Sequence, residues 1–113
     1  MYKELKVWQK AMDLVPEIYK ICDTLPKSED YNLKSQIKRA IVSVPLNIAE
    51  GKSRFSTNEF AHFLNIASAS LIEVEVALEI AVKLNYIEDF NTVKQDINEL
   101  SRMLNALRTK ILT

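Results

Sequence analysis

Apolar residues recur every three or four positions in four separate stretches of this chain, the spacing typical of amphipathic helices. The pattern predicts helices over residues 3–25, 29–51, 56–84 and 89–111. Because the connections between them are short, consecutive helices should run in opposite directions. We therefore expect an all-α fold, an antiparallel up-and-down four-helix bundle, as a single domain spanning residues 1–113.

Each predicted helix has an apolar row suited to a shared core. The four rows, in chain order, are Leu5, Trp8, Met12, Val15, Tyr19 and Cys22; Leu33, Ile37, Ile41, Val44 and Ile48; Phe60, Leu64, Ala67, Leu71, Val74, Leu78 and Ala81; and Phe90, Val93, Ile97, Leu100, Leu104, Leu107 and Ile111. The third helix has a second row, Ile66, Ala69, Val76 and Ile80, interrupted by Glu73. Two rows indicate that this helix is buried on more than one side.

Local signals mark where the helices begin and end. Ser56 followed by Glu59 has the spacing of a capping box at the start of the third helix. Ser28 is a candidate N-cap for the second helix, with Glu29 next to it. Gly51 is the single glycine in the chain, and we expect it to end the second helix in the left-handed conformation.

The composition supports a helical domain and limits the function. One glycine and three prolines supply too few turn residues for a β-rich fold. The 15 basic and 15 acidic residues cancel, which argues against a strongly basic nucleic-acid-binding protein. No apolar run approaches the ~20 residues of a membrane span. The first residues have no apolar signal core, so we expect a cytoplasmic protein.

Enzyme-like motifs are sparse. Glu59 and His62 have the Glu-x-x-His spacing of half a di-iron site, but His62 is the only histidine, so one chain cannot complete that site. Cys22 lies on an apolar row, where a lone thiol is usually a small core residue. A single glycine excludes a phosphate-binding loop. We therefore expect no catalytic residues, no metal site and no cofactor.

The second predicted helix carries a polar row beside its apolar one, formed by Gln36, Ser43, Asn47 and Glu50. Asn is disfavoured within helices, so its presence between a proline and the glycine calls for a polar partner. We expect Arg39 or a neighbouring Arg to pair with Glu50 or Glu73. The predicted assembly network, Arg39, Asn47, Glu50 and Glu73, would be buried or interfacial and would fix the register of the helices.

Charge is distributed unevenly along the chain. Residues 28–55 contain five basic and three acidic residues, whereas residues 56–86 contain one basic and four acidic. The cations that form the candidate nucleic-acid contact are Lys34, Lys38, Arg39, Lys52 and Arg54. Only Tyr31 and Phe55 are interleaved with them, which is few aromatic residues for stacking on bases.

Several motifs together resemble a known family. They are Leu5–Ala11 (LKVWQKA), Leu25-Pro26 with Glu29, Gln36–Ala40 (QIKRA), Ser43–Gly51 (SVPLNIAEG), Glu59-Phe60 with Phe63-Leu64, and Ala67–Glu75. Over about residues 2–87 the chain resembles bacterial four-helix-bundle proteins encoded within intervening sequences of 23S ribosomal RNA genes. The resemblance implies a homopentamer without established catalytic residues. A related branch, the accessory proteins of diversity-generating retroelements, is basic and binds nucleic acid and a reverse transcriptase; this chain is neutral.

The sequence favours two hypotheses for the function. The first is a non-enzymatic oligomeric bundle that binds structured RNA or a nucleoprotein partner through its second helix and the following loop. The second is a structural or protein-interaction bundle without nucleic-acid affinity. A salt-dependent RNA shift favours the first, and its absence at low salt favours the second. An enzyme is the third and weakest hypothesis.

Overall fold

Four long helices make up the fold in the computed structural model, which describes all 113 residues. They are α1 (Lys6–Asp23), α2 (Leu33–Lys52), α3 (Thr57–Lys83) and α4 (Asn91–Leu112). Two short 3-10 turns, η1 (Tyr2–Glu4) and η2 (Lys27–Glu29), precede α1 and α2. The predicted all-α four-helix bundle is confirmed.

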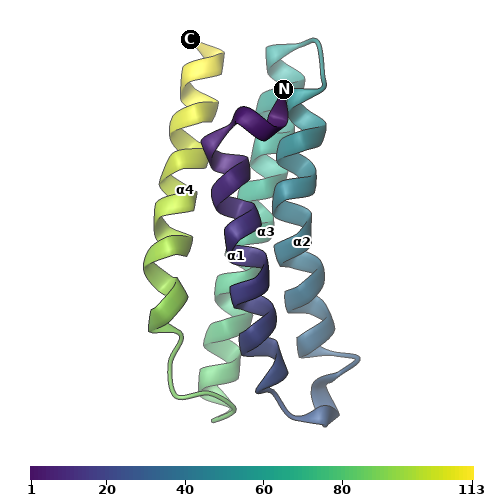
Figure 1. Ribbon diagram of the computed structural model, residues 1–113, viewed down its shortest axis with the longest axis vertical. Coiled ribbons are helices and arrows are strands. Elements are labelled where there is room, and N and C mark those ends of the chain that lie inside the picture. Colours follow the sequence, from purple (N-terminus) through teal and green to yellow (C-terminus); the bar gives the residue numbers. More distant parts are fainter.

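The helices alternate in direction along a molecule that measures 44 × 24 × 20 Å (Figure 1). Each helix contacts the helices before and after it, and α4 closes the bundle against α1. The α2–α3 connection lies at the same end as both chain termini (Figure 1). The α1–α2 and α3–α4 connections lie at the opposite end. This arrangement brings segments far apart in the sequence together at each end of the bundle.

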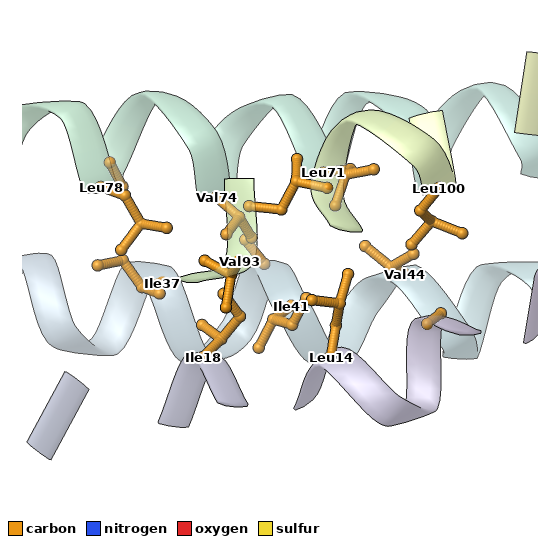
Figure 2. Close-up of a cluster of buried hydrophobic side chains, with 14 of the residues drawn as sticks. Leu14, Ile18, Ile37, Ile41, Val44, Leu71, Val74, Leu78, Val93 and Leu100 are labelled. Atoms are coloured by element: carbon orange, nitrogen blue, oxygen red, sulfur yellow. The ribbon is translucent and has the colours of Figure 1, made fainter. Parts of the chain in front are cut away.

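The predicted apolar row of α2 and the first predicted row of α3 are buried in full, and α4 buries its row from Phe90 to Leu104. Leu107 and Ile111 continue the α4 row as half-buried residues packed against the core. Figure 2 shows side chains from all four helices meeting in this core, including Leu14 and Leu100. These three rows are therefore confirmed, whereas the second row predicted for α3 is not part of this core.

The row predicted for the first helix is wrong by one position. The residues that face the core are Val7, Ala11, Leu14, Ile18 and Cys22. Of the predicted row only Cys22 is fully buried, and Met12 is 43% exposed. The first helix has two adjacent apolar rows, and spacing alone does not decide which one faces inward. The larger rings of Trp8 and Tyr19 lie at the edge of the core, where their polar atoms can reach water.

Gly51 does not end a helix in the left-handed conformation, so this prediction is wrong. The α2 helix continues through Gly51 to Lys52, and no glycine has a positive φ angle. Gly51 instead permits a close approach of α3. A Cβ atom added there would lie 2.8 Å from Cβ of Phe63 and 2.9 Å from Cδ1 of Phe60. The glycine is required for packing between helices rather than for a turn.

The left-handed residue of the chain is Asn85, with a φ angle of 61°. It follows the last turn of α3 in a Schellman motif. The N–H of Tyr86 donates to the carbonyl of Ala81 at 2.9 Å, and the N–H of Asn85 donates to that of Val82 at 3.0 Å. Asn tolerates this conformation better than most residues. The capping box at the start of α3 is also supported, since Oγ of Ser56 accepts the N–H of Glu59 at 3.2 Å.

Ser28 is not the N-cap of the second helix, because residues 27–29 form η2 and α2 begins only at Leu33. The carboxylate of Glu29 performs the capping role. Its Oε1 accepts the backbone N–H of Leu33 at 3.2 Å and the side-chain amide of Asn32 at 3.1 Å. Its Oε2 accepts the hydroxyl of Tyr86 at 2.8 Å. This carboxylate therefore ties the α1–α2 connection to the α3–α4 connection.

These hydrogen bonds change the acidity of both partners. The hydrogen bond from Tyr86, followed by the one from the Leu33 backbone, lowers the pKa of Glu29 below its usual value. The same hydrogen bond to the carboxylate, reinforced by partial desolvation, raises the pKa of Tyr86. The tie is therefore strongest when Glu29 is ionised and Tyr86 is protonated.

Candidate functional site

A short polar ladder joins α2 to α3 along their outer seam. The side-chain amide of Asn47 donates to the carbonyl and to Oγ of Ser43, both at 2.8 Å. Oγ of Ser43 lies 2.9 Å from Oγ of Ser70 on α3, so the two hydroxyls share a hydrogen bond. The ladder supplies the polar partner that Asn47 needs within a helix. Since all three side chains are half-buried, it also helps to fix the register of the two helices.

Arg39 and Glu73 lie beside the same seam without pairing. Both are exposed and border a hollow of about 410 Å³, together with Gln36, Ala40, Ser43 and Ser70. No ion pair joins them. Each therefore presents an unpaired charge at the rim of a polar hollow.

Glu50 lies outside this hollow, nearer the end of α2. Eleven residues separate it from Arg39, about 16 Å along the helix, so the two cannot pair within one chain. Its partner is a neighbouring arginine, Arg54, at 3.0 Å on the surface. The predicted residues Arg39, Asn47, Glu50 and Glu73 do not form one network within a single chain, and none of them is buried. Their role at an interface between chains remains a prediction.

The five candidate nucleic-acid-binding cations do not form one patch. Near the start of α2, Nζ of Lys34 is bound to the carboxylate of Asp30 at 2.6 Å. Nζ of Lys38 lies 5.0 Å from the centre of the Tyr19 ring on α1. These two lysines are therefore half-buried among groups of the same chain.

Lys52 and Arg54 lie at the other end of α2, about 27 Å from Lys34 along the helix. Nζ of Lys52 lies 5.9 Å from the centre of the Phe60 ring, and the Arg54 guanidinium lies 5.0 Å from that of Phe63. Both cations remain exposed at the turn into α3. The five predicted contact residues therefore fall into two groups, Lys34, Lys38 and Arg39 in the first turns of α2 and Lys52 and Arg54 at its end.

The outer side of α3 carries an exposed apolar row. Ile72, Val76 and Ile80 are 58%, 48% and 44% exposed, and Leu84 continues the row at the end of the helix. Val76 and Ile80 also border a groove of about 730 Å³ between the end of α3 and the start of α4. The sequence pattern identified Val76 and Ile80 but missed Ile72 and Leu84, although all four share a spacing of four residues.

The groove beside this row has an acidic rim. Glu79 borders it from α3, and Glu88 and Asp89 border it from the connection to α4. Lys83 and Lys94 are the cations at its edge. In the row predicted for this side of α3, Ile66 is half-buried, whereas Ala69, Val76 and Ile80 are exposed. Burial of that row within an assembly remains a prediction.

The enzyme-like residues do not come together. Cys22 is completely buried, and desolvation raises the pKa of its thiol. The ring of His62 is exposed and meets that of Phe63 edge-on, with the ring centres 5.8 Å apart. No group of three or more His, Cys, Asp or Glu side chains is arranged to hold a metal ion. None of the helices is both long enough and apolar enough to span a membrane.

The fold and these surfaces define a four-helix bundle with a polar α2–α3 seam and an uncovered apolar row on α3. Comparison with protein families assigns residues 3–106 to the family of the 23S rRNA-intervening sequence protein, and the chain belongs to that family. Among solved structures, it is similar to a protein of unknown function from the S23 ribosomal protein family of Bacteroides thetaiotaomicron VPI-5482. The two share 26% identity and a TM-score of 0.81, over 90% of this chain and 97% of the other. Comparison with curated proteins finds no match.

Proposed function

We propose that this protein is a non-enzymatic scaffold that assembles with copies of itself through the outer side of α3. The observation that carries the proposal is the row of Ile72, Val76 and Ile80, about half exposed on a helix whose inner side is already packed. Leaving apolar area in water costs roughly 25 cal/mol per Å², and contiguous apolar rows rimmed by polar residues are typical of interfaces.

The geometry of the row indicates how a partner helix would lie on it. Residues in steps of four form a ridge inclined by about 26° to the helix axis. A helix packed against such a ridge crosses α3 at an angle. Arg39 and Glu73, unpaired at the nearby seam, would then take partners from the other copy. The family resemblance implies that the assembly contains five copies.

Mass measurement of two matched variants tests this proposal. Val76→Glu combined with Ile80→Glu places two charges on the apolar row, and we expect assemblies to dissociate to the 13.0 kDa chain in light scattering. Met12→Glu introduces a charge at a similarly exposed apolar position on α1 and should leave the assembly mass unchanged. An unchanged mass for the α3 variant, with helicity retained, would refute assembly through this face.

A second candidate function is nucleic-acid binding, and one observation favours it. At the α2–α3 turn, Lys52 and Arg54 are exposed next to Phe55, whose side chain is fully exposed. Exposed cations beside an exposed ring suit phosphate contact and base stacking. A gel shift with structured RNA at low salt is the first test. The absence of any shift would favour a bundle that binds only proteins.

A further inference from the structure

We propose that a single-stranded nucleic acid binds across the end of the bundle that carries both chain termini, which we call the basic end. It comprises residues 1–6, 50–62 and 102–113. The inference rests on the second candidate function and extends its contact from the α2–α3 turn across this whole end, instead of along α2 toward Lys38 and Lys34. The ligand is recognised by its phosphates and by one unstacked base, chemistry that RNA and DNA share.

Charge is separated along the molecule although the net charge is zero. The basic end contains seven Lys or Arg residues and three Glu residues. In contrast, residues 73–89, the second half of α3 and its connection to α4, contain five acidic residues and one basic residue. The helix directions place these regions apart along the 44 Å axis (Figure 1). A polyanion would therefore be attracted to the basic end and repelled from the second half of α3.

The cations of the basic end are free to bind a ligand. Six of the seven form no ion pair: Lys3, Lys6, Lys52, Arg102, Arg108 and Lys110. The seventh, Arg54, has one surface partner in Glu50. Elsewhere Lys10 is held by Asp96 and Glu99 at 3.2 and 3.4 Å, and Lys34 is held by Asp30, whereas the remaining cations form no ion pair. Positive potential is concentrated at this end because seven cations face only three carboxylates there.

Three separate segments lie at this end of the bundle. The turn η1 contacts α2, and a hollow of about 320 Å³ lies between Met1, Tyr2, Lys52 and Ser53. The last turns of α4 lie at the same end of the bundle (Figure 1). The cross-section of the bundle, 24 × 20 Å, is wide enough for a few successive phosphates of one strand.

Phe55 adds a feature that points to bases. Phe55 is fully exposed at the tip of the α2–α3 turn, directly after Arg54. A ring that packs against nothing in its own chain is a platform for one unpaired base. A membrane surface fits less well, because the exposed apolar residues Met1, Phe55 and Leu112 come from three segments and form no amphipathic helix face.

The test is a titration of fluorescent single-stranded RNA, and of DNA of the same sequence, with the full chain at several salt concentrations. With four or five phosphate contacts, we expect log affinity to fall with log salt with a slope of about −3. Lys52→Glu with Lys110→Glu should weaken binding by more than tenfold and make the slope shallower. Phe55→Ala should weaken binding by about tenfold and leave the slope unchanged.

The controls keep the alternatives apart. Lys83→Glu with Lys94→Glu makes the same change in net charge outside the basic end and should bind like the unmodified protein. If this control weakens binding equally, or if only Lys38→Glu with Arg39→Glu does so, the basic end is the wrong site while nucleic-acid binding stands. If no strand binds at low salt, both the site and the second candidate function fail. Binding only to anionic vesicles, lost with Phe55→Ala, would overturn the proposal in favour of a membrane surface.

Discussion

The two sides of α3 differ in what covers them rather than in how apolar they are. Leu71 and Ile72 are adjacent in sequence and similar in size, yet Leu71 is 1% exposed and Ile72 is 58% exposed. The inner row alternates steps of three and four residues and stays on one face, where α2 and α4 pack against it. The outer row advances in steps of four and winds around the helix. The comparison shows that an apolar pattern identifies a surface for packing but not the molecule that packs on it.

The largest effect should separate these two neighbours. Leu71→Ala removes a fully packed side chain and should lower the free energy of unfolding by about 2–5 kcal/mol. Ile72→Ala removes a side chain that no other part of the chain covers, so its effect should appear only through assembly and depend on protein concentration. Denaturant unfolding at two protein concentrations measures both. A large, concentration-independent loss for Ile72→Ala would show that the outer side is part of the core.

Gly51→Ala tests the close packing on the inner side. Alanine favours a helix by about 1 kcal/mol over glycine. Its Cβ would however meet the Cβ of Phe63 and the backbone carbonyl of Phe60, at 2.8 and 3.3 Å, and neither atom can move without shifting α3. Overpacking of this kind costs about 1–3 kcal/mol, so we expect a net loss on the order of 1 kcal/mol in thermal unfolding. A stabilised variant would mean that the α2–α3 approach can widen freely.

Glu73→Leu extends the outer apolar side next to the polar hollow. Glu73 is exposed and has no ion-pair partner, so the change should leave helicity and chain stability nearly unaffected. We expect the mass of the assembly to change, because an unpaired charge at the edge of the interface becomes apolar. Circular dichroism with light scattering provides the measurement. An identical assembly mass would place Glu73 outside any interface.

The smallest effect concerns the hydrogen bond that holds the end of α3. The folded-state pKa of Glu29 is lowered, so its contribution to stability is present above its unfolded value and is lost as the pH falls through the folded value. The folded-state pKa of Tyr86 is raised, so its contribution is present below about pH 10 and is lost as the pH rises through the folded value.

Tyr86→Phe removes this tie without altering the ring. We expect the pKa of Glu29 to rise toward its ordinary value, as measured by NMR titration of its carboxyl carbon. Thermal stability should then become less dependent on pH below about pH 5. Tyr31→Phe, which alters a fully exposed tyrosine near the same connection, is the matched control and should leave the titration unchanged. An unshifted Glu29 in the Tyr86 variant would show that the Leu33 and Asn32 contacts alone set its pKa.

Much of the fold follows from the sequence because local signals agree with packing. The rows of α2, α3 and α4 have strong periodicity and meet in one core, and Ser56 caps α3 through a contact three residues away. The predicted buried face of the first helix is wrong because two apolar rows lie side by side on this helix. Choosing between them requires knowledge of where α2 and α4 lie.

The errors at the helix ends and in the polar network have a common cause. Gly51 packs against Phe63 of α3, and Glu29 adds a bond from Tyr86 to its local capping contacts. The polar ladder reaches another helix only through the Ser43–Ser70 contact, since Asn47 bonds to Ser43 within α2. No spacing within one helix encodes such partners. The separation of charge between the two ends likewise depends on the helix directions, which bring distant segments together at each end.

The mass of the unmodified chain in solution tests the central claim most directly. Native mass spectrometry over a dilution series should detect a discrete assembly at a multiple of 13.0 kDa, five copies being the number that the family resemblance implies. Dilution should dissociate that assembly to single chains. A species of 13.0 kDa alone at every concentration, including the highest at which the protein stays in solution, would contradict assembly through the outer side of α3.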